Sequence, residues 1–254
     1  MATVMMQGLE QSSAELINPQ GTSDVLLVCE HASHYIPENF ANLGLSEAER
    51  LSHIGWDIGA ANMARALSEM LDASLVLQRY SRLLYDCNRP PSAASAVPLL
   101  SEVTEIPGNK ELTLEQWDYR VTHIYRPFHA EIEQQIATRK ALGRHTTLVT
   151  IHSFTPLFKG QKRSVQLGVI CHEGNAFAKA FYEHVRQQGS DDIRMNEPYG
   201  PSDPVLHLVT RHGDDQQVAN VMLEVRNDLI VDAAGQQAWA QTVAATLNSL
   251  ALLT

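Results

Sequence analysis

Two apolar stretches of the chain end in histidine, and they carry the strongest chemical signal in the sequence. Residues 25–29 lead into Glu30 and His31, and residues 148–151 lead into His152. Neutral imidazole is the usual zinc ligand, and catalytic zinc sites combine three protein ligands with one open position. Two histidines at matching strand ends therefore predict a metal site. The alternative is that each is an ordinary hydrogen-bonded histidine.

A third ligand can come from several nearby groups. Asp57 stands where an N-cap or first-turn carboxylate of the following helix would stand, and Glu30 precedes His31 directly. His34 lies three residues after His31, but it belongs to a loop that leads to Pro37, where solvent exposure is equally expected. These residues alone leave the choice between Asp57, Glu30 and His34 open.

Two groups of charged residues accompany these histidines. Glu224 and Arg226 lie on one face of an otherwise apolar strand, where a charge is costly unless it is paired or lies at an open edge. Arg82, Asn88 and Arg89 can bind a carboxylate, because a guanidinium offers it a planar fork. The alternatives are a structural ion pair between Glu224 and Arg226 and a solvated surface cluster of arginines.

The elements that position these groups alternate between strands and helices. Short apolar strands at 25–29, 75–77, 148–151, 165–170 and 221–226 are separated by helical patterns, of which the longest covers 113–143. This alternation predicts βαβ units and a mainly parallel α/β sheet. Residues 91–109 form a long loop, a length that is usually functional, such as a lid. We expect residues 1–20 to form an N-terminal arm and residues 21–254 a single domain.

Composition excludes several classes of protein. The formal net charge is −10, which disfavours nucleic acid and anionic membranes as partners. No 18-residue apolar run and no signal peptide is visible, and the three cysteines show no CxxC spacing. These features indicate a cytoplasmic protein. We expect its partner to be a small-molecule substrate and the protein itself to be a monomer or a small homo-oligomer. No GxSxG elbow or glycine-rich phosphate loop is present.

Taken together, the motifs resemble the N-formylglutamate amidohydrolase family, and they cover the chain in order from about residue 24 to residue 250. The matching stretches are CEHAS…IP (Cys29 to Pro37), HIGWDIGA (His53 to Ala60), SRLLYDCNRP (Ser81 to Pro90), IPGN (Ile106 to Asn109), YRPFH (Tyr125 to His129), IHSFTP (Ile151 to Pro156), RHG (Arg211 to Gly213) and LEVRNDLI (Leu223 to Ile230).

The resemblance implies a three-layer α/β/α fold with a mixed, mostly parallel central sheet, as in the zinc-dependent exopeptidases. It also implies zinc, or another divalent metal, and hydrolysis of the amide of an N-formyl or other N-acyl acidic amino acid, in histidine catabolism. Carried over, His31 and His152 become metal ligands and Glu224 the general base. Asn88 and Arg89 become the clamp for the substrate carboxylate.

The second ligand departs from the related exopeptidase pattern, which expects His-x-x-Glu where this chain has His34. We expect Asp57 to supply the carboxylate, because Glu30 would point away from His31 on an extended strand. Arg82 or Arg226 would bind the oxyanion or a second carboxylate. Further supporting residues would be Glu30, Ser33 and His212.

Three alternatives remain open at this stage. The same scaffold can act as a zinc peptidase or deacylase of another acyl specificity. It can be a binding module for acidic amino acids with reduced catalysis. It can also be a structural protein whose histidines are satisfied core groups.

Overall fold

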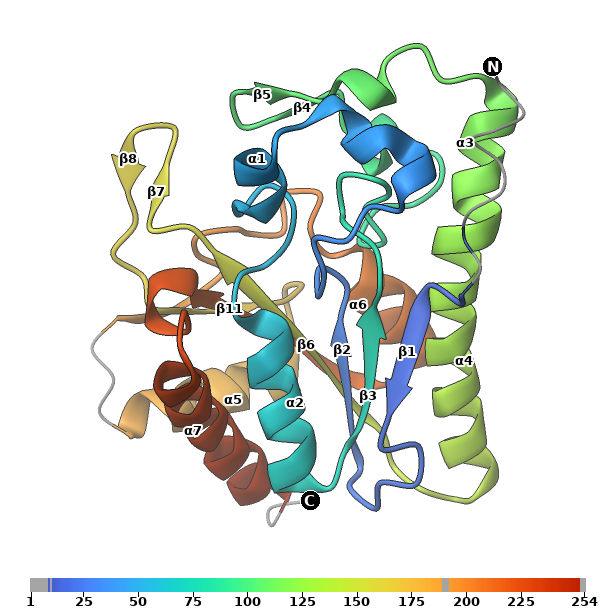
Figure 1. Cartoon of the computed structure of the whole chain (residues 1–254). Coiled ribbons are helices and arrows are strands. Elements are labelled where there is room, and N and C mark those ends of the chain that lie inside the picture. The colour runs from blue at the N-terminus through green and yellow to red at the C-terminus, as the bar shows by residue number, and fades with distance from the viewer. Residues whose placement is uncertain (1–8, 10, 189–191, 252–254) are drawn as a thin grey trace.

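A sheet of seven strands forms the middle layer of the protein, shown in Figure 1 as a computed structural model that describes residues 9, 11–188 and 192–251. The strand order is β1-β3-β2-β6-β11-β9-β10. The strands are β1 (Ala14–Ile17), β2 (Val25–Cys29), β3 (Ser74–Gln78), β6 (Thr147–Phe154), β9 (Leu167–Ile170), β10 (Ile193–Met195) and β11 (Ala219–Arg226). Two small hairpins, β4 (Leu100–Ser101) with β5 (Thr104–Glu105) and β7 (Leu157–Phe158) with β8 (Gln161–Lys162), lie outside it.

The four central strands, β3, β2, β6 and β11, are parallel to one another. Strand β1 pairs antiparallel with β3, and β9 pairs antiparallel with β11, which confirms the predicted mixed, mostly parallel sheet. Because parallel strands end at the same edge, the residues that follow β2, β3, β6 and β11 gather there. This edge is where the predicted functional residues lie.

Helices cover both faces of the sheet and complete the three-layer α/β/α architecture (Figure 1). Helices α2 (Ala60–Leu71), α5 (Ala176–Gln187) and α7 (Ala233–Ala251) pack on one face, and α4 (Arg126–Ala141) and α6 (His207–His212) on the other. The remaining helices are α1 (Glu47–Leu51) and α3 (Leu114–Arg120). None of the helices in the described part of the chain is long and apolar enough to cross a membrane.

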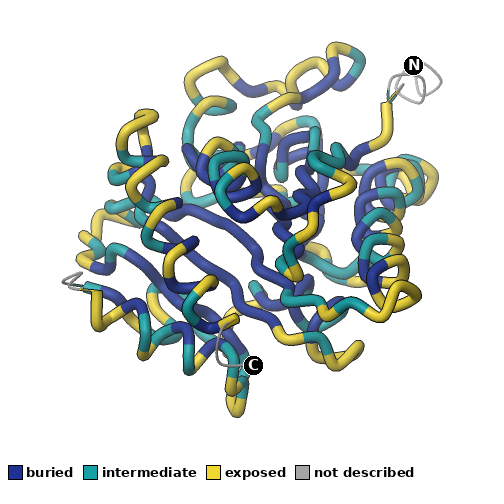
Figure 2. The backbone as a smooth tube through the Cα atoms, turned by 90° about the horizontal axis from the view of Figure 1, so that it is seen from below, coloured by how far each residue is buried: buried dark blue, intermediate teal, exposed yellow. Residues whose placement is uncertain are grey.

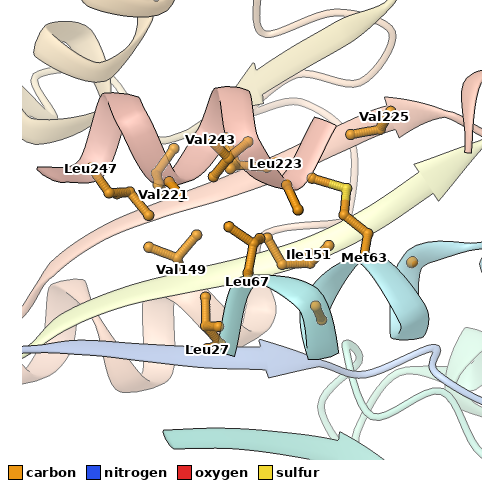
Figure 3. Packing of buried hydrophobic residues seen from close by; sticks show 14 of the residues in the cluster. Leu27, Met63, Leu67, Val149, Ile151, Val221, Leu223, Val225, Val243 and Leu247 are labelled. Atoms are coloured by element: carbon orange, nitrogen blue, oxygen red, sulfur yellow. The ribbon is translucent and has the colours of Figure 1, made fainter. Parts of the chain in front are cut away.

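Alternate residues of each central strand supply two separate cores. On one face, Leu27, Val149 and Val221 meet Met63 of α2 and Val243 of α7 (Figure 3). The other face presents the intervening residues of the same strands to α4. Burial on both faces explains why these strands read as continuous apolar runs instead of alternating ones. Seen from below, buried strands run through the middle of the molecule and the outer helix surfaces are exposed (Figure 2).

The long helical pattern between residues 113 and 143 is interrupted but not broken. A capping box of Thr113 and Gln116 starts α3, and a π-helical turn at Val121–Tyr125 joins it to α4. Pro127 lies in the first turn of α4. Proline has no N–H to donate, and this position of a helix tolerates that loss best. The irregularity in this helical stretch therefore takes the form of a π-helical turn.

Two segments differ from their sequence interpretation. Residues 14–17, which the sequence placed in an N-terminal arm, are the edge strand β1 and pair with β3; residues 1–8 and 10 of this arm lie outside the described residues. The loop at 91–109 contains 3-10 turns at Ala94–Ala96 and Pro107–Asn109 around the β4–β5 hairpin. It is anchored by Asn109, whose amide donates to the carbonyls of Leu83 and Pro98.

Candidate active site

Two histidines and an aspartate from three different segments meet at the carboxyl edge of the sheet. The Nδ1 atom of His152 lies 2.8 Å from Oδ2 of Asp57, and Nδ1 of His31 lies 3.3 Å from the same oxygen. One ligand atom from each residue fits within a cluster in which all three atoms are less than 4.8 Å apart. All three side chains are buried. The structure thus brings together the three residues that the sequence analysis placed at the metal.

The second ring nitrogen of each histidine contacts another buried carboxylate. Nε2 of His31 lies 2.8 Å from Oδ1 of Asp86, and Nε2 of His152 lies 3.1 Å from Oε2 of Glu30. Histidines that bind metal almost always donate their other N–H to such a partner, which fixes the ring orientation and tautomer. Glu30 does point away from His31, as expected, and it turns toward the other histidine instead.

Asp86 was not singled out from the sequence, although the local pattern held a signal for it. It follows the buried run Leu83–Tyr85 in the same way that Glu30 and His31 follow β2. A carboxylate directly after a buried run is costly unless it has partners. The structure supplies those partners, which are His31 and Arg82.

Asp57 reaches the histidines because of the tight turn that starts α2. Its N–H donates to the carbonyl of His31 at 2.9 Å, which ties this turn to the end of β2. Gly59 has φ +82°, and a Cβ there would lie 2.1 Å from the carbonyl oxygen of Ile230. Only glycine fits this position without strain. The glycine therefore sets the direction in which the Asp57 carboxylate points.

Opposite charges hold the buried carboxylates in their ionised form. Burial by itself would raise the pKa of Asp57, but His31 and a hydrogen bond from His152 outweigh it and lower that pKa. The pKa of Asp86 is likewise held well below its usual range against burial, by His31, Arg89 and Arg82. For His152 burial favours the neutral ring, but Glu30 and Asp57 reverse this effect and raise the pKa.

Arg82 links the two aspartates. Its NH1 lies 3.3 Å from Oδ1 of Asp57, and its NH2 lies 3.1 Å from Oδ2 of Asp86. Arg89 lies 4.0 Å from the same Asp86 oxygen, and its buried Nε has no hydrogen-bond partner. Arg89 is therefore better placed than Arg82 to bind another anion, since both terminal nitrogens of Arg82, NH1 and NH2, already contact aspartates.

Glu224 is a buried carboxyl group with an unpartnered oxygen. It lies directly beside His152 in the register of β11 and β6, and no group in the described structure donates to its Oε2. Burial raises its pKa to about 7, with His152 opposing the rise. A carboxyl group that titrates near neutral pH can both accept and return a proton.

Two residues predicted to bind substrate have other partners. The side-chain amide of Asn88 donates to the carbonyl of Val205 at 2.6 Å and accepts from the N–H of Leu208 at 3.0 Å. It thereby fastens the segment before α6 to the Asp86–Arg89 segment. Arg226 pairs with Asp228 at 2.7 Å, not with Glu224. The structural ion pair considered between Glu224 and Arg226 is therefore not formed.

The remaining predicted groups lie outside the His–Asp–His cluster. Ser33 accepts a hydrogen bond from the N–H of Tyr35 and lines a separate cavity of about 930 Å³. His34 packs edge-on against Trp56 with its ring centroid 5.0 Å away. These contacts give both residues a role in shaping the loop after β2.

His212 belongs to a second buried histidine pair. Its Nε2 lies 2.6 Å from Nδ1 of His129, whose Nε2 lies 2.9 Å from the carbonyl of Cys87. A carbonyl only accepts, so His129 donates from Nε2 and accepts at Nδ1 from His212. Burial lowers the pKa of His212 to about 3, which keeps it neutral. Through the hydrogen bond from His129 to the Cys87 carbonyl, the pair holds the Asp86–Arg89 segment in place.

The donor set suits a divalent cation. Four buried carboxyl groups, those of Glu30, Asp57, Asp86 and Glu224, face the guanidinium groups of Arg82 and Arg89. When both imidazoles are neutral, as metal binding requires, and all four carboxyl groups are ionised, these groups carry an excess of two negative charges, which a divalent cation would balance. Two imidazoles and one carboxylate are also the three-ligand set of open catalytic zinc sites. His31, Asp57 and His152 can therefore hold such an ion.

The fold and the cluster define the chain as a three-layer α/β/α protein with a buried His–Asp–His group at the carboxyl edge of its sheet, and comparison with known proteins identifies its class. A crystal structure of a gene product from Agrobacterium tumefaciens superposes with a TM-score of 0.91 at 42% identity, covering 95% of this chain and 97% of that one. N-formylglutamate amidohydrolase from Ralstonia eutropha shares the fold, with a TM-score of 0.71 at 16% identity over 96% and 98% of the two chains. No curated protein sequence matches.

The model of the N-formylglutamate amidohydrolase family matches residues 23–231. The chain belongs to this family, and it is a hydrolase that acts on amide bonds. The sequence resemblance is thus confirmed at the level of the family. All three cysteines are buried and free.

Proposed function

We propose that the protein is a metal-dependent amidohydrolase that cleaves the amide of an N-formyl or other N-acyl acidic amino acid, such as N-formylglutamate. The observation that carries this proposal is the buried His31–Asp57–His152 cluster with the unpartnered carboxyl of Glu224 beside it. The substrate class rests on the family and on the two guanidinium groups near the cluster.

In this proposal His31, Asp57 and His152 hold a divalent ion, with zinc as the expected metal. Such an ion supplies Lewis acidity, which polarises a substrate carbonyl and lowers the pKa of a water molecule. Asp86 keeps the His31 imidazole oriented by accepting a hydrogen bond from its Nε2, and Glu30 does the same for His152 through the 3.1 Å ion pair with its Nε2. Arg82 balances the charge of the two aspartates.

Glu224 performs the proton transfers. Its free Oε2 accepts a proton from the attacking water, and the same carboxyl group returns the proton to the departing amine nitrogen. A pKa of about 7 suits both steps at neutral pH. Arg89 binds a carboxylate of the amino acid half through its unpartnered Nε, and Asn88 holds Arg89 in place through its contacts with the segment before α6.

The test has two measurements on purified protein. We expect about one zinc ion per chain after expression with zinc, and turnover of N-formylglutamate above that of N-acetyl and N-succinyl amino acids. Glu224→Gln should retain the metal and lose activity by a factor on the order of 10²–10⁴. Exposed Glu183 on α5 provides the control, Glu183→Gln, which should leave turnover unchanged.

Two results would contradict the proposal, and a third would change only the acyl group of the substrate. Near-wild-type turnover in Glu224→Gln would show that Glu224 is not the general base. Protein without metal after zinc-replete expression, yet with bound acidic amino acids, would favour a binding module. Preference for a different acyl group would keep the hydrolase and change its substrate.

A further inference from the structure

One arginine near the candidate site has aromatic rings around it and no acidic partner. The guanidinium of Arg163, just after β8, lies over the rings of Phe158 at 4.5 Å, Tyr199 at 5.0 Å and Phe154 at 5.7 Å. Arg226 and Arg82 each contact a carboxylate, whereas none of the described carboxylates lies within 4.0 Å of Arg163. Its charge is therefore not neutralised within the described protein.

The backbone of Arg163 is fixed on both sides. Its N–H donates to the carbonyl of Pro156 at 2.8 Å. Arg226 donates from NH1 to the carbonyls of Arg163 and Ser164, at 3.3 Å and 2.7 Å. Arg226, which the sequence analysis placed at the substrate, thus positions the segment that carries Arg163.

Arg163 lies at the same sheet edge as the cluster. Phe154, under its guanidinium, follows His152 by two residues on β6, so both side chains lie on one face about 7 Å apart. On the other side, the carbonyl of Glu197 lies so close to Gly168 that a Cβ there would be 2.1 Å away. Gly168 is the register partner of Glu224.

This close approach places the loop that carries Tyr199 next to Glu224. The electrostatics agree, because the pKa of Tyr199 is raised mainly by burial and then by Glu224, while Arg163 opposes the rise. Tyr199 also accepts a hydrogen bond from NH1 of Arg163 at 3.2 Å. Its ring and hydroxyl therefore connect Arg163 to the candidate site.

The three aromatic rings around Arg163 also determine which part of its guanidinium can bind a ligand. Aromatic rings attract a guanidinium to their faces and hold its plane, while its N–H donors lie at the edge of that plane. A carboxylate binds such an edge with two parallel hydrogen bonds. Arg89 follows β3, whereas Arg163 follows the hairpin after β6. The two guanidinium groups thus approach the cluster from opposite sides along the sheet.

We infer that Arg163 recognises the side-chain carboxylate of the substrate's acidic amino acid and so determines specificity for a dicarboxylic product. This inference rests on the proposed function and deepens it. Arg89 would then bind the α-carboxylate. Arg163 is a specificity residue and takes no part in proton transfer.

The test compares two substrates that differ only in charge, N-formylglutamate and N-formylglutamine. Arg163→Met should lower kcat/KM for N-formylglutamate roughly 10- to 100-fold, mainly through KM, because a charge-assisted contact is lost. The same variant should change kcat/KM for N-formylglutamine less than about threefold. Tyr199→Phe keeps the ring but removes the hydroxyl contact, and should give a smaller loss in the same direction.

The matched control is Arg194→Met, since Arg194 is exposed and already paired with Asp192 and Glu197. It should leave both substrates unchanged. Equal losses for the two substrates in Arg163→Met, or no loss for either, would overturn the inference.

If the wild type hydrolyses neither compound, the proposed function fails, and binding then decides the role of Arg163. Glutamate should raise the Tm of the wild type more than glutamine does, by mass action on the folded state. Arg163→Met should abolish that difference. A preference for glutamate that survives in Arg163→Met would refute the inference independently of catalysis.

Discussion

Glu224→Gln, which should remove the activity of the metal-loaded enzyme, should make the metal-free protein more stable. The Glu224 carboxyl is buried, its Oε2 has no donor, and burial raises its pKa from 4.5 to about 7. Between these two values the folded state keeps a proton that the unfolded chain has released. Rising pH therefore favours the unfolded state. Glutamine has nearly the same shape but no charge to desolvate.

The size of the effect follows from the two pKa values. At pH 5 the carboxyl is almost fully protonated in the folded protein and about three-quarters ionised in the unfolded chain, so only about 1 kcal/mol of stability is lost. At pH 8 it is ionised in both states, and the folded state is destabilised by the free energy that corresponds to the difference between the two pKa values. The free energy of unfolding of Glu224→Gln relative to wild type should therefore rise by on the order of 2 kcal/mol between pH 5 and pH 8.

Urea unfolding of both proteins in the presence of a chelator measures this difference directly. Glu183→Gln is the control, because that carboxylate lies on the surface of α5. The reasoning would be refuted if the difference in the free energy of unfolding did not change with pH, or if the wild type became more stable relative to the variant toward pH 8. Adding zinc should reverse the order, because a cation near Glu224 favours its charged form.

Three further predictions concern the supports of the site. Because His212 is buried with a pKa of about 3, proton uptake by the unfolded histidine should lower the stability of the chelated wild type relative to His212→Gln by roughly 3 kcal/mol as the pH falls from 7.5 to 4; equal slopes in urea titrations of the two proteins would contradict this. Gly59→Ala should lower the free energy of unfolding by about 1–3 kcal/mol, since its Cβ meets the Ile230 carbonyl; an unchanged urea midpoint would disprove the constraint. Asp86→Asn should weaken zinc binding roughly 10- to 100-fold in a chelator competition, and unaltered affinity would show that His31 needs no such partner.

The sequence predicted the parts of the site that local patterns determine. Buried strands are continuous apolar runs, so the ionisable residues at their ends, His31, His152 and Glu224, stand out against them. Parallel strands then place those ends at one edge of the sheet. Asp57 was recognisable because it precedes a clear helical pattern, although the turn at Gly59 decides its direction.

Contacts between distant segments could not be read from the chain. Nothing near Asn88 indicates that its amide will bind the backbone 117 and 120 residues later, and nothing near Glu30 indicates its contact with His152. The same holds for the contact between Arg163 and Tyr199, which lies 36 residues later in the chain. Strand β1 was missed because its four residues are only partly buried and lack a continuous apolar run.

The place of β11 in the sheet has a consequence for the synthesis of the protein. This strand is the last in the chain, yet it is inserted between β6 and β9 in the middle of the sheet. Until residue 226 has left the ribosome, two apolar strands have unpaired edges, which are templates for association with other chains. The same strand brings Glu224, so a nascent chain gains its final sheet pairing and its proposed base in one step. Incomplete chains are therefore both prone to aggregation and without the proposed base.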